Sequence, residues 1–269
     1  MSVIETEGLS KFYGAERGIE EVTVTVEAGE VFAFLGPNGA GKTTTIRTLL
    51  DLLHPTAGSA RIFGLDSRRD SVAIRARLGN LPGDFGYGKR SSGREALGLL
   101  ARLRGVDGLG RAEELARRFH ADLDRPLGQL SRGNRQKVGL ITALFHSPEL
   151  LILDEPTSGL DPLMQEEFLA LVREERERGC AVFLSSHELD EVERVCDRVG
   201  IIRDGRLVAV ERVADLLAKT MERRKVEVEF AEPVELGQVR ELPGVVAAEF
   251  ARPTLEEVFL TYYSEEGER

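Results

Sequence analysis

The chain contains little cysteine and no long apolar segment. Its 269 residues include two cysteines, Cys180 and Cys196, which have neither metal-site spacing nor the pattern of a disulfide framework. The longest nearly apolar stretch, Val138–Phe145, falls far short of the roughly 20 residues that span a bilayer. The first residues have neither the basic nor the apolar region of a secretory signal. We therefore expect a protein that works from the cytosol and crosses no membrane itself.

Basic residues are in the minority. The chain has 36 Lys and Arg against 46 Asp and Glu, a net charge of −10, which argues against a dedicated nucleic-acid-binding protein. Hydrophobic residues at 42% and charged residues at 30% are typical of a folded globular protein. The length is enough for one large domain, or for one domain with an appendage, and for a sizeable buried core. We expect no nucleic-acid partner.

The order of periodic segments predicts an α/β protein. The first sixty or so residues are mostly strand-like, with one helix expected over Lys42–Leu53. The second half alternates strand and helix, which implies parallel pairing of its strands. The expected strands are Glu21–Val26, Val31–Leu35, Ala60–Phe63, Leu150–Leu153, Ala181–Leu184 and Val199–Arg203, and the later helices are Leu163–Arg178 and Glu188–Cys196.

Two regions interrupt this alternation. Residues 84–146 form an expected helical insertion with helices over Arg94–Arg104, Arg111–Phe119 and Asn134–His146. Beyond residue 219 the composition changes, and residues 220–269 are expected to form a small α+β extension. It contains an alternating strand, Lys225–Phe230, and a capping-box sequence at residues 254–257. We therefore expect a main domain over residues 1–219 followed by this extension.

A phosphate-binding loop is the strongest motif. Residues 36–43 match G-x-x-x-x-G-K-[ST] between a predicted strand and a predicted helix, which is the context that this motif requires. Its glycines allow backbone N–H groups to surround phosphate oxygens. A plain glycine-rich turn is the alternative, but the pattern arises by chance only about once in a hundred chains of this length. The candidate ATP-binding residues are Gly36, Pro37, Asn38, Gly39, Ala40, Gly41, Lys42, Thr43 and Thr44.

Two acidic residues complete the expected site. Asp154 and Glu155 follow an entirely apolar strand, and such strands in α/β folds end at the ligand crevice. Lys42 would neutralise the β- and γ-phosphates, while Thr43 and Asp154 would hold Mg²⁺. Glu155 would activate the attacking water. The alternative is that both acids only cap the strand and face solvent.

A third segment resembles a known family. Leu130–Gln136, with the sequence LSRGNRQ, resembles the LSGGQ signature of ATP-binding cassette (ABC) ATPases, which other phosphate-loop classes lack. Tyr13 resembles the family's adenine-stacking aromatic residue, Ser158–Asp161 its D-loop, and His187 its switch histidine. The resemblance covers about residues 1–215. It implies a RecA-like parallel-sheet core with an N-terminal antiparallel β subdomain.

The sequence is most similar to the cytosolic ATPase subunits of ABC-2-type exporters, including drug-efflux systems. Residues 253–259 match the P-[ST]-L-E-[DE]-V-F segment that is common in the C-terminal extensions of such subunits. The resemblance implies an ATPase that binds Mg²⁺ and dimerises around two ATP molecules. It also implies that the ATPase sits at the cytoplasmic face of the membrane and drives a separate transmembrane permease, docked near residues 84–100. The signature residues Ser131, Arg132, Gly133 and Asn134 would act on ATP held by the second copy.

The sequence departs from the family pattern at two places. Gly83 and Asp84 stand where the family has its Q-loop glutamine, so either Asp84 replaces that ligand or Mg²⁺ relies on Thr43 and water. Arg132 replaces a signature glycine, and it either contacts phosphate or is a solvated surface arginine. Asn134 keeps an amide with a shorter reach.

Other interpretations of these motifs remain open. Tyr13 could be a packing residue with Phe12 as the alternative stacking aromatic, and His187 could be an ordinary loop histidine. A soluble cassette ATPase acting on ribosomes or DNA is the rival function, although such proteins usually carry two cassettes or a long coiled-coil insertion. A small-molecule kinase or GTPase would not need the signature, and the guanine-reading motif N-K-x-D is absent.

Overall fold

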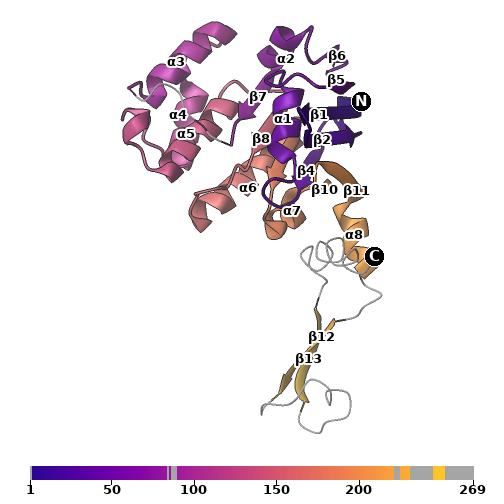
Figure 1. Cartoon of the computed structure of the whole chain (residues 1–269). Coiled ribbons are helices and arrows are strands. Elements are labelled where there is room, and N and C mark those ends of the chain that lie inside the picture. The colour runs from indigo at the N-terminus through magenta and orange to yellow at the C-terminus, as the bar shows by residue number, and fades with distance from the viewer. Residues whose placement is uncertain (1, 84, 86–89, 221–224, 231–244, 252–269) are drawn as a thin grey trace. The chain divides into compact units, whose positions relative to one another are not determined.

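The computed structural model describes residues 2–83, 85, 90–220, 225–230 and 245–251 (Figure 1). The chain divides into two compact units, residues 1–210 and residues 211–269. The larger unit contains both main sheets and every site residue predicted above that the structure describes.

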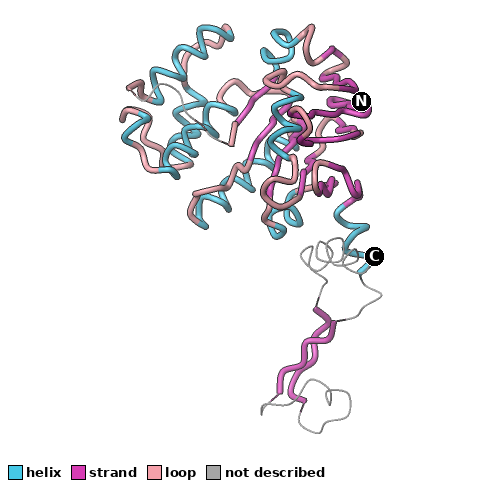
Figure 2. Tube along the Cα trace, in the orientation of Figure 1, coloured by secondary structure: helices cyan, strands magenta, loops and turns pink. Residues whose placement is uncertain are grey.

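A six-stranded sheet forms the centre of the larger unit (Figure 2). Its order is β11-β10-β4-β9-β8-β7, and the pairs from β10 to β7 are parallel, as the alternation of strands and helices predicts. The central strands are buried along their whole length, which is why they are apolar up to the polar residues at the carboxyl ends of β8 and β9. The strands are β4 (Val31–Leu35), β7 (Leu78–Leu81), β8 (Leu150–Asp154), β9 (Ala181–Ser186), β10 (Arg198–Arg203) and β11 (Arg206–Arg212).

An antiparallel sheet lies at the N-terminal end of the sequence, which confirms the expected β subdomain. The strand expected over residues 21–26 is divided in two, because residues 23–24 are outside any strand and the segments on either side pair with different parts of the first strand. The strands of this sheet are β1 (Ser2–Tyr13), β2 (Glu16–Val22), β3 (Thr25–Glu27), β5 (Ala57–Ile62) and β6 (Leu65–Asp66).

Helices flank the parallel sheet. The helix after the phosphate loop, α1 (Lys42–Leu49), ends four residues earlier than predicted, because Asp51 takes a left-handed backbone with φ 56°. The others are α2 (Ser71–Arg77), α6 (Pro162–Glu177) and α7 (Leu189–Val195). Within the sheet, Phe32 of β4 lies opposite Phe183 of β9, with ring centroids 5.7 Å apart and nearly parallel planes. This aromatic pair supports the register of the two strands that carry the site.

The predicted helical insertion consists of α3 (Gly93–Arg104), α4 (Gly110–Arg118), a 3₁₀ turn (Leu127–Gln129) and α5 (Arg132–Leu144). Figure 1 shows the three helices grouped together. A capping box between Ser92 and Glu95 starts α3. Ion pairs from Arg111 to Glu175 and from Arg118 to Glu174 join α4 to α6, so the insertion is anchored to the sheet core.

The second unit begins within β11 and includes α8 (Val213–Thr220), β12 (Lys225–Phe230) and β13 (Val245–Ala251). The two strands pair antiparallel, so the strand predicted over residues 225–230 is confirmed. The capping box and the motif at residues 253–259 lie outside the described residues. No helix in the described part of the chain is both long and apolar enough for a bilayer crossing.

Candidate functional site

The candidate site lies where three parallel strands end together. Strands β4, β9 and β8 are neighbours, and their register pairs Leu35 with Ser186 and Asp154 with Ser185. The carboxyl ends of these strands therefore meet at one edge of the sheet, the usual place for a ligand crevice in α/β folds. The phosphate loop leaves β4 at this edge.

The phosphate loop depends on its glycines for steric reasons. A Cβ at Gly36 would lie 2.4 Å from the Ile202 carbonyl oxygen. Gly41 has a φ of 111°, and a Cβ there would lie 2.9 Å from the Gly18 carbonyl oxygen. Gly41 directly precedes α1, so the loop delivers a helix N-terminus to the crevice. A cavity of about 170 Å³ is lined by Pro37, Asn38, Gly39, Gly41, Lys42, Thr43, Thr44 and Glu155.

Lys42 is almost fully buried, with 5% of its surface exposed. Its ammonium group donates hydrogen bonds to the carbonyl oxygens of Gly36 at 2.6 Å and Pro37 at 3.2 Å. It also lies 3.2 Å from Oε1 of Glu155. A buried cation beside a carboxylate at a helix N-terminus is well suited to an incoming phosphate.

Thr43 and Asp154 offer the oxygen atoms for a metal. The Thr43 hydroxyl donates to Oδ2 of Asp154 at 2.8 Å, and the Ser185 hydroxyl donates to Oδ1 at 2.6 Å. Mg²⁺ typically binds one or two protein oxygens together with phosphate oxygens and water, so this pair fits it. Among the described residues no group of three or more His, Cys, Asp or Glu side chains forms another metal site.

Glu155 has a strained backbone and lies between Lys42 of the phosphate loop and His187. Its backbone is left-handed, with φ 51°. While Oε1 faces Lys42, Oε2 lies 2.6 Å from Nδ1 of His187. His187 itself is about half exposed. The structure thus brings together Lys42, Glu155 and His187, three residues predicted from separate motifs.

Tyr13 lies beside the phosphate loop at the end of β1. This residue is 47% exposed. A Cβ at Gly18 would lie 2.8 Å from Cε2 of Tyr13 and 3.1 Å from Cγ2 of Thr44, so the ring and the loop share one small neighbourhood. An exposed aromatic face at this place suits stacking of a base.

The signature segment lies at the start of α5. Ser131 is the N-cap, and its hydroxyl accepts a hydrogen bond from the Asn134 N–H at 3.3 Å. Arg132 donates to the Ser158 hydroxyl at 2.7 Å, a contact with the D-loop that neither sequence interpretation of Arg132 included. Gly133 approaches the D-loop so closely that a Cβ would lie 2.5 Å from the Gly159 carbonyl oxygen.

The last D-loop residue begins a helix. Asp161 is the N-cap of α6, and its carboxylate accepts a hydrogen bond from the Met164 N–H at 3.0 Å. Lys137 of α5 lies 3.8 Å from the other carboxylate oxygen of Asp161. Helix α5 therefore contacts both the first and the last residue of the D-loop, Ser158 and Asp161.

Gly83, which stands at the position of the expected Q-loop glutamine, lies close to the site. A Cβ at Gly83 would lie 3.0 Å from Oδ2 of Asp154. Asp84, the proposed replacement ligand, lies outside the described residues. Its role stays a prediction.

Three polar residues that contact the site were not singled out in the sequence. The Ser185 hydroxyl accepts a hydrogen bond from the Glu155 N–H at 3.0 Å, and the Gln136 amide donates one to the Glu155 carbonyl oxygen at 3.0 Å. Glu191 of α7 accepts from the Thr157 hydroxyl at 2.9 Å and from the Ser186 hydroxyl at 3.3 Å. Burial raises the pKa of Glu191 to about 7. What could have identified these three residues in the sequence is their polar character within otherwise apolar stretches.

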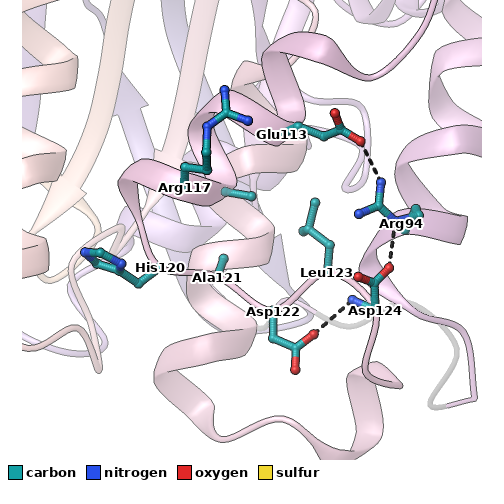
Figure 3. A pocket seen from close by; sticks show the side chains of 9 residues that line it. Arg94, Glu113, Arg117, His120, Ala121, Asp122, Leu123 and Asp124 are labelled. Atoms are coloured by element: carbon teal, nitrogen blue, oxygen red, sulfur yellow. Dashed lines mark hydrogen bonds and ion pairs between the residues drawn. The ribbon is translucent and has the colours of Figure 1, made fainter.

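A larger pocket, of about 480 Å³, lies in the helical insertion (Figure 3). Arg94 bridges Glu113 and Asp124 within it, at 2.8 Å and 2.6 Å. None of the predicted site residues lines this pocket. Because Arg94, Glu113 and Asp124 already pair with one another, we interpret the pocket as a structural ion-pair network.

Comparison with known proteins places these features in context. Residues 19–158 match the family model described as ABC transporter. The bacitracin transport ATP-binding protein BcrA of Bacillus licheniformis is 38% identical over 77% of this chain and 69% of that protein. The daunorubicin/doxorubicin resistance ATP-binding protein DrrA of Streptomyces peucetius is 37% identical over 79% and 66%. A solved ATP-binding subunit of an ABC transporter superposes with a TM-score of 0.76 at 32% identity, over 82% of this chain and 94% of the other.

Proposed function

The chain belongs to the ABC transporter family, as an ATP-binding and ATP-hydrolysing subunit of an exporter, and from this premise we propose how its residues divide the work. The observation that carries the proposal is the convergence of Lys42, Glu155 and His187 at the end of the parallel sheet. A cation for phosphate, a carboxylate for water and a histidine on that carboxylate are the parts that in-line hydrolysis of ATP requires.

The phosphate loop would bind ATP and exchange one partner of Lys42 for another. Lys42 lies 3.2 Å from Glu155, and phosphate oxygens that reach the ammonium group would replace that carboxylate as its counter-charge. Glu155 is then free to accept a proton from the attacking water, with His187 orienting its other oxygen. Tyr13 would stack on the adenine ring.

Thr43 and Asp154 would hold Mg²⁺ at the phosphates. Both offer hard oxygen donors, and Ser185 fixes the Asp154 carboxylate from the far side. When bound, the ion neutralises charge on the phosphate oxygens. Asp84 would be the additional ligand in place of the Q-loop glutamine.

The signature segment would act on the nucleotide of a second copy. Ser131 and the free N–H groups at the start of α5 form an exposed, anion-attracting surface. In a two-fold dimer each copy would present this surface to the ATP held by the other, so that two ATP molecules lie between them. The D-loop residues Ser158 and Asp161 would lie along the same interface.

A groove between the core and the insertion would receive the membrane subunit. It encloses about 300 Å³, and Arg104 of α3 closes one side by donating to the Arg75 and Leu78 carbonyl oxygens at 2.9 and 3.1 Å. Leu52 at its rim is 59% exposed. Its lining is largely apolar and consists of Leu50, Leu52, Arg75, Leu78, Asn80, Pro82, Phe85, Leu100, Arg104 and Thr142. A short cytoplasmic helix of the permease fits such a groove.

Peripheral attachment at the cytoplasmic face of the membrane follows from this docking. The names of the two antibiotic-related relatives favour a cargo of the antibiotic type. They also favour the exporter over the soluble alternative, because both are named for transport or drug resistance.

The test is co-purification from detergent-solubilised host membranes. We expect the tagged chain to bring down a multi-span membrane protein in stoichiometric amount. Leu52→Glu should abolish that association and keep ATP binding, whereas Val208→Glu, on β11 outside the groove, should change neither. Recovery of ribosomes or DNA without a membrane protein would contradict the proposal.

A further inference from the structure

The backbone of Glu155 cannot hold its conformation unaided. A left-handed φ of 51° at a residue other than glycine is strained and persists only where neighbouring groups hold it. The conformation also matters for the reaction, because it sets where the carboxylate points. Whatever holds this backbone therefore holds the group that activates water.

Residues of two elements, β9 and α5, form hydrogen bonds with the backbone of Glu155. Its N–H donates to the Ser185 hydroxyl of β9 at 3.0 Å. On the opposite side, Nε2 of Gln136 donates to the Glu155 carbonyl oxygen at 3.0 Å and to the Pro156 carbonyl oxygen at 2.9 Å. Gln136 is only 7% exposed, so these bonds are shielded from water.

Gln136 lies on the signature helix. It follows Ser131, the N-cap of α5, by five residues, which on a helix is a rise of about 7.5 Å. Gly133, between them, lies against Gly159 without room for a Cβ, so this part of α5 is in direct contact with the chain that follows Glu155. A displacement of the exposed start of α5 therefore moves the Gln136 amide relative to Glu155, or moves Glu155 with it.

We propose that Gln136 is a positioning residue that links the signature end of α5 to the glutamate of its own subunit. Contact of Ser131 with the partner's ATP fixes α5, and the Gln136 amide then fixes the backbone of Glu155 in its productive conformation. Each copy thereby prepares its own hydrolytic group when it recognises the nucleotide held by the other. The inference rests on the proposed dimer and on the proposed role of Glu155.

The experiment compares turnover and ATP affinity in variants of the full-length chain. Gln136→Leu removes both donated hydrogen bonds, and Gln136→Asn keeps the amide but shortens its reach. We expect kcat to fall about 100-fold in the first and less in the second, with the KM for ATP within about two-fold. Gln129→Leu and Gln129→Asn change an exposed glutamine of the preceding 3₁₀ turn and should leave kcat unchanged.

A double-mutant cycle separates linkage from general damage to the fold. If Gln136 transmits the signature contact, adding Gln136→Leu to Ser131→Ala should lower kcat little further. The reason is that Ser131→Ala has already removed the contact that Gln136 would transmit. Multiplicative losses would overturn the proposal. So would wild-type kcat in both Gln136 variants, while an unmutated protein that hydrolyses no ATP would instead refute the proposed function. If Gln136→Leu fails to fold, the same cycle is run with Gln136→Asn.

Discussion

Nδ1 of His187 lies 2.6 Å from Oε2 of Glu155, and this contact joins residues 32 positions apart in the sequence. Because the other carboxylate oxygen lies 3.2 Å from Nζ of Lys42, each oxygen of Glu155 has its own partner. We therefore expect the carboxylate to keep its contact with His187 when phosphate oxygens take its place beside Lys42. Such preorganisation reduces the rearrangement needed at the moment of reaction.

Replacing Glu155 with Gln should stop turnover and leave ATP binding intact. The amide preserves the shape of the side chain but accepts no proton from water, so we expect phosphate release to fall at least ~100-fold. The variant should then accumulate as an ATP-dependent dimer, because hydrolysis no longer opens it. Phosphate release and light scattering measure the two effects. Only monomer at saturating ATP and Mg²⁺ would refute the two-ATP dimer.

Replacing His187 with Ala should lower kcat by about 100-fold, since Glu155 loses the group that orients its outer oxygen. The affinity for ATP should change little, because the phosphate loop and Tyr13 are untouched. His54→Ala, at an exposed histidine after α1, is the matched control and should retain full activity. Equal activities of the two variants would remove His187 from the site.

The parts of the site that motifs define were predictable from the sequence. The phosphate loop fixes its own geometry through glycines, as the 2.4 Å approach at Gly36 illustrates. The pairing of Thr43 with Asp154 follows from parallel strands that end at one edge. Short sequence patterns of this kind determine the local conformation, which is why the fold class and the central strands were predicted correctly.

The remaining contacts depend on packing that no local pattern encodes. Gln136 reaches Glu155 only because α5 lies against the chain after β8, and Ser185 does so only through the register of β8 with β9. Arg132 shows the same limit, since its partner Ser158 lies 26 residues away in the sequence. The early end of α1 has a different cause. Asp51 takes a left-handed backbone conformation that its residue type alone does not predict.

Glu191 should make stability depend on pH. Burial and the nearby Glu188 carboxylate raise its pKa from 4.5 to about 7. A raised pKa in the folded state gives stability that is complete below the unfolded value and is lost as the pH rises through about 7. Glu191→Gln keeps an acceptor for Thr157 and carries no charge. It should therefore exceed the wild type in unfolding free energy by roughly 2 to 4 kcal/mol at pH 8 and match it at pH ~4, below the unfolded pKa. Urea unfolding at both pH values measures this, and a difference independent of pH would contradict it.

Asp84 should set the Mg²⁺ requirement. The neighbouring Gly83 lies so close to Asp154 that a Cβ would approach Oδ2 within 3.0 Å, so Gly83 itself lies against a proposed metal ligand. A carboxylate one residue later is a hard oxygen donor of the kind that Mg²⁺ selects. Asp84→Ala should therefore raise the Mg²⁺ concentration for half-maximal hydrolysis several-fold, with ATP in excess.

The control for Asp84 is Asp107→Ala, which removes an equal charge from an exposed position between α3 and α4. Because both variants lose one negative charge, a shift caused by overall charge would appear in both. A shift confined to Asp84→Ala assigns the effect to the site. An unchanged Mg²⁺ titration for Asp84→Ala would exclude Asp84 and leave Thr43, Asp154 and water as the oxygen ligands beside the nucleotide phosphates.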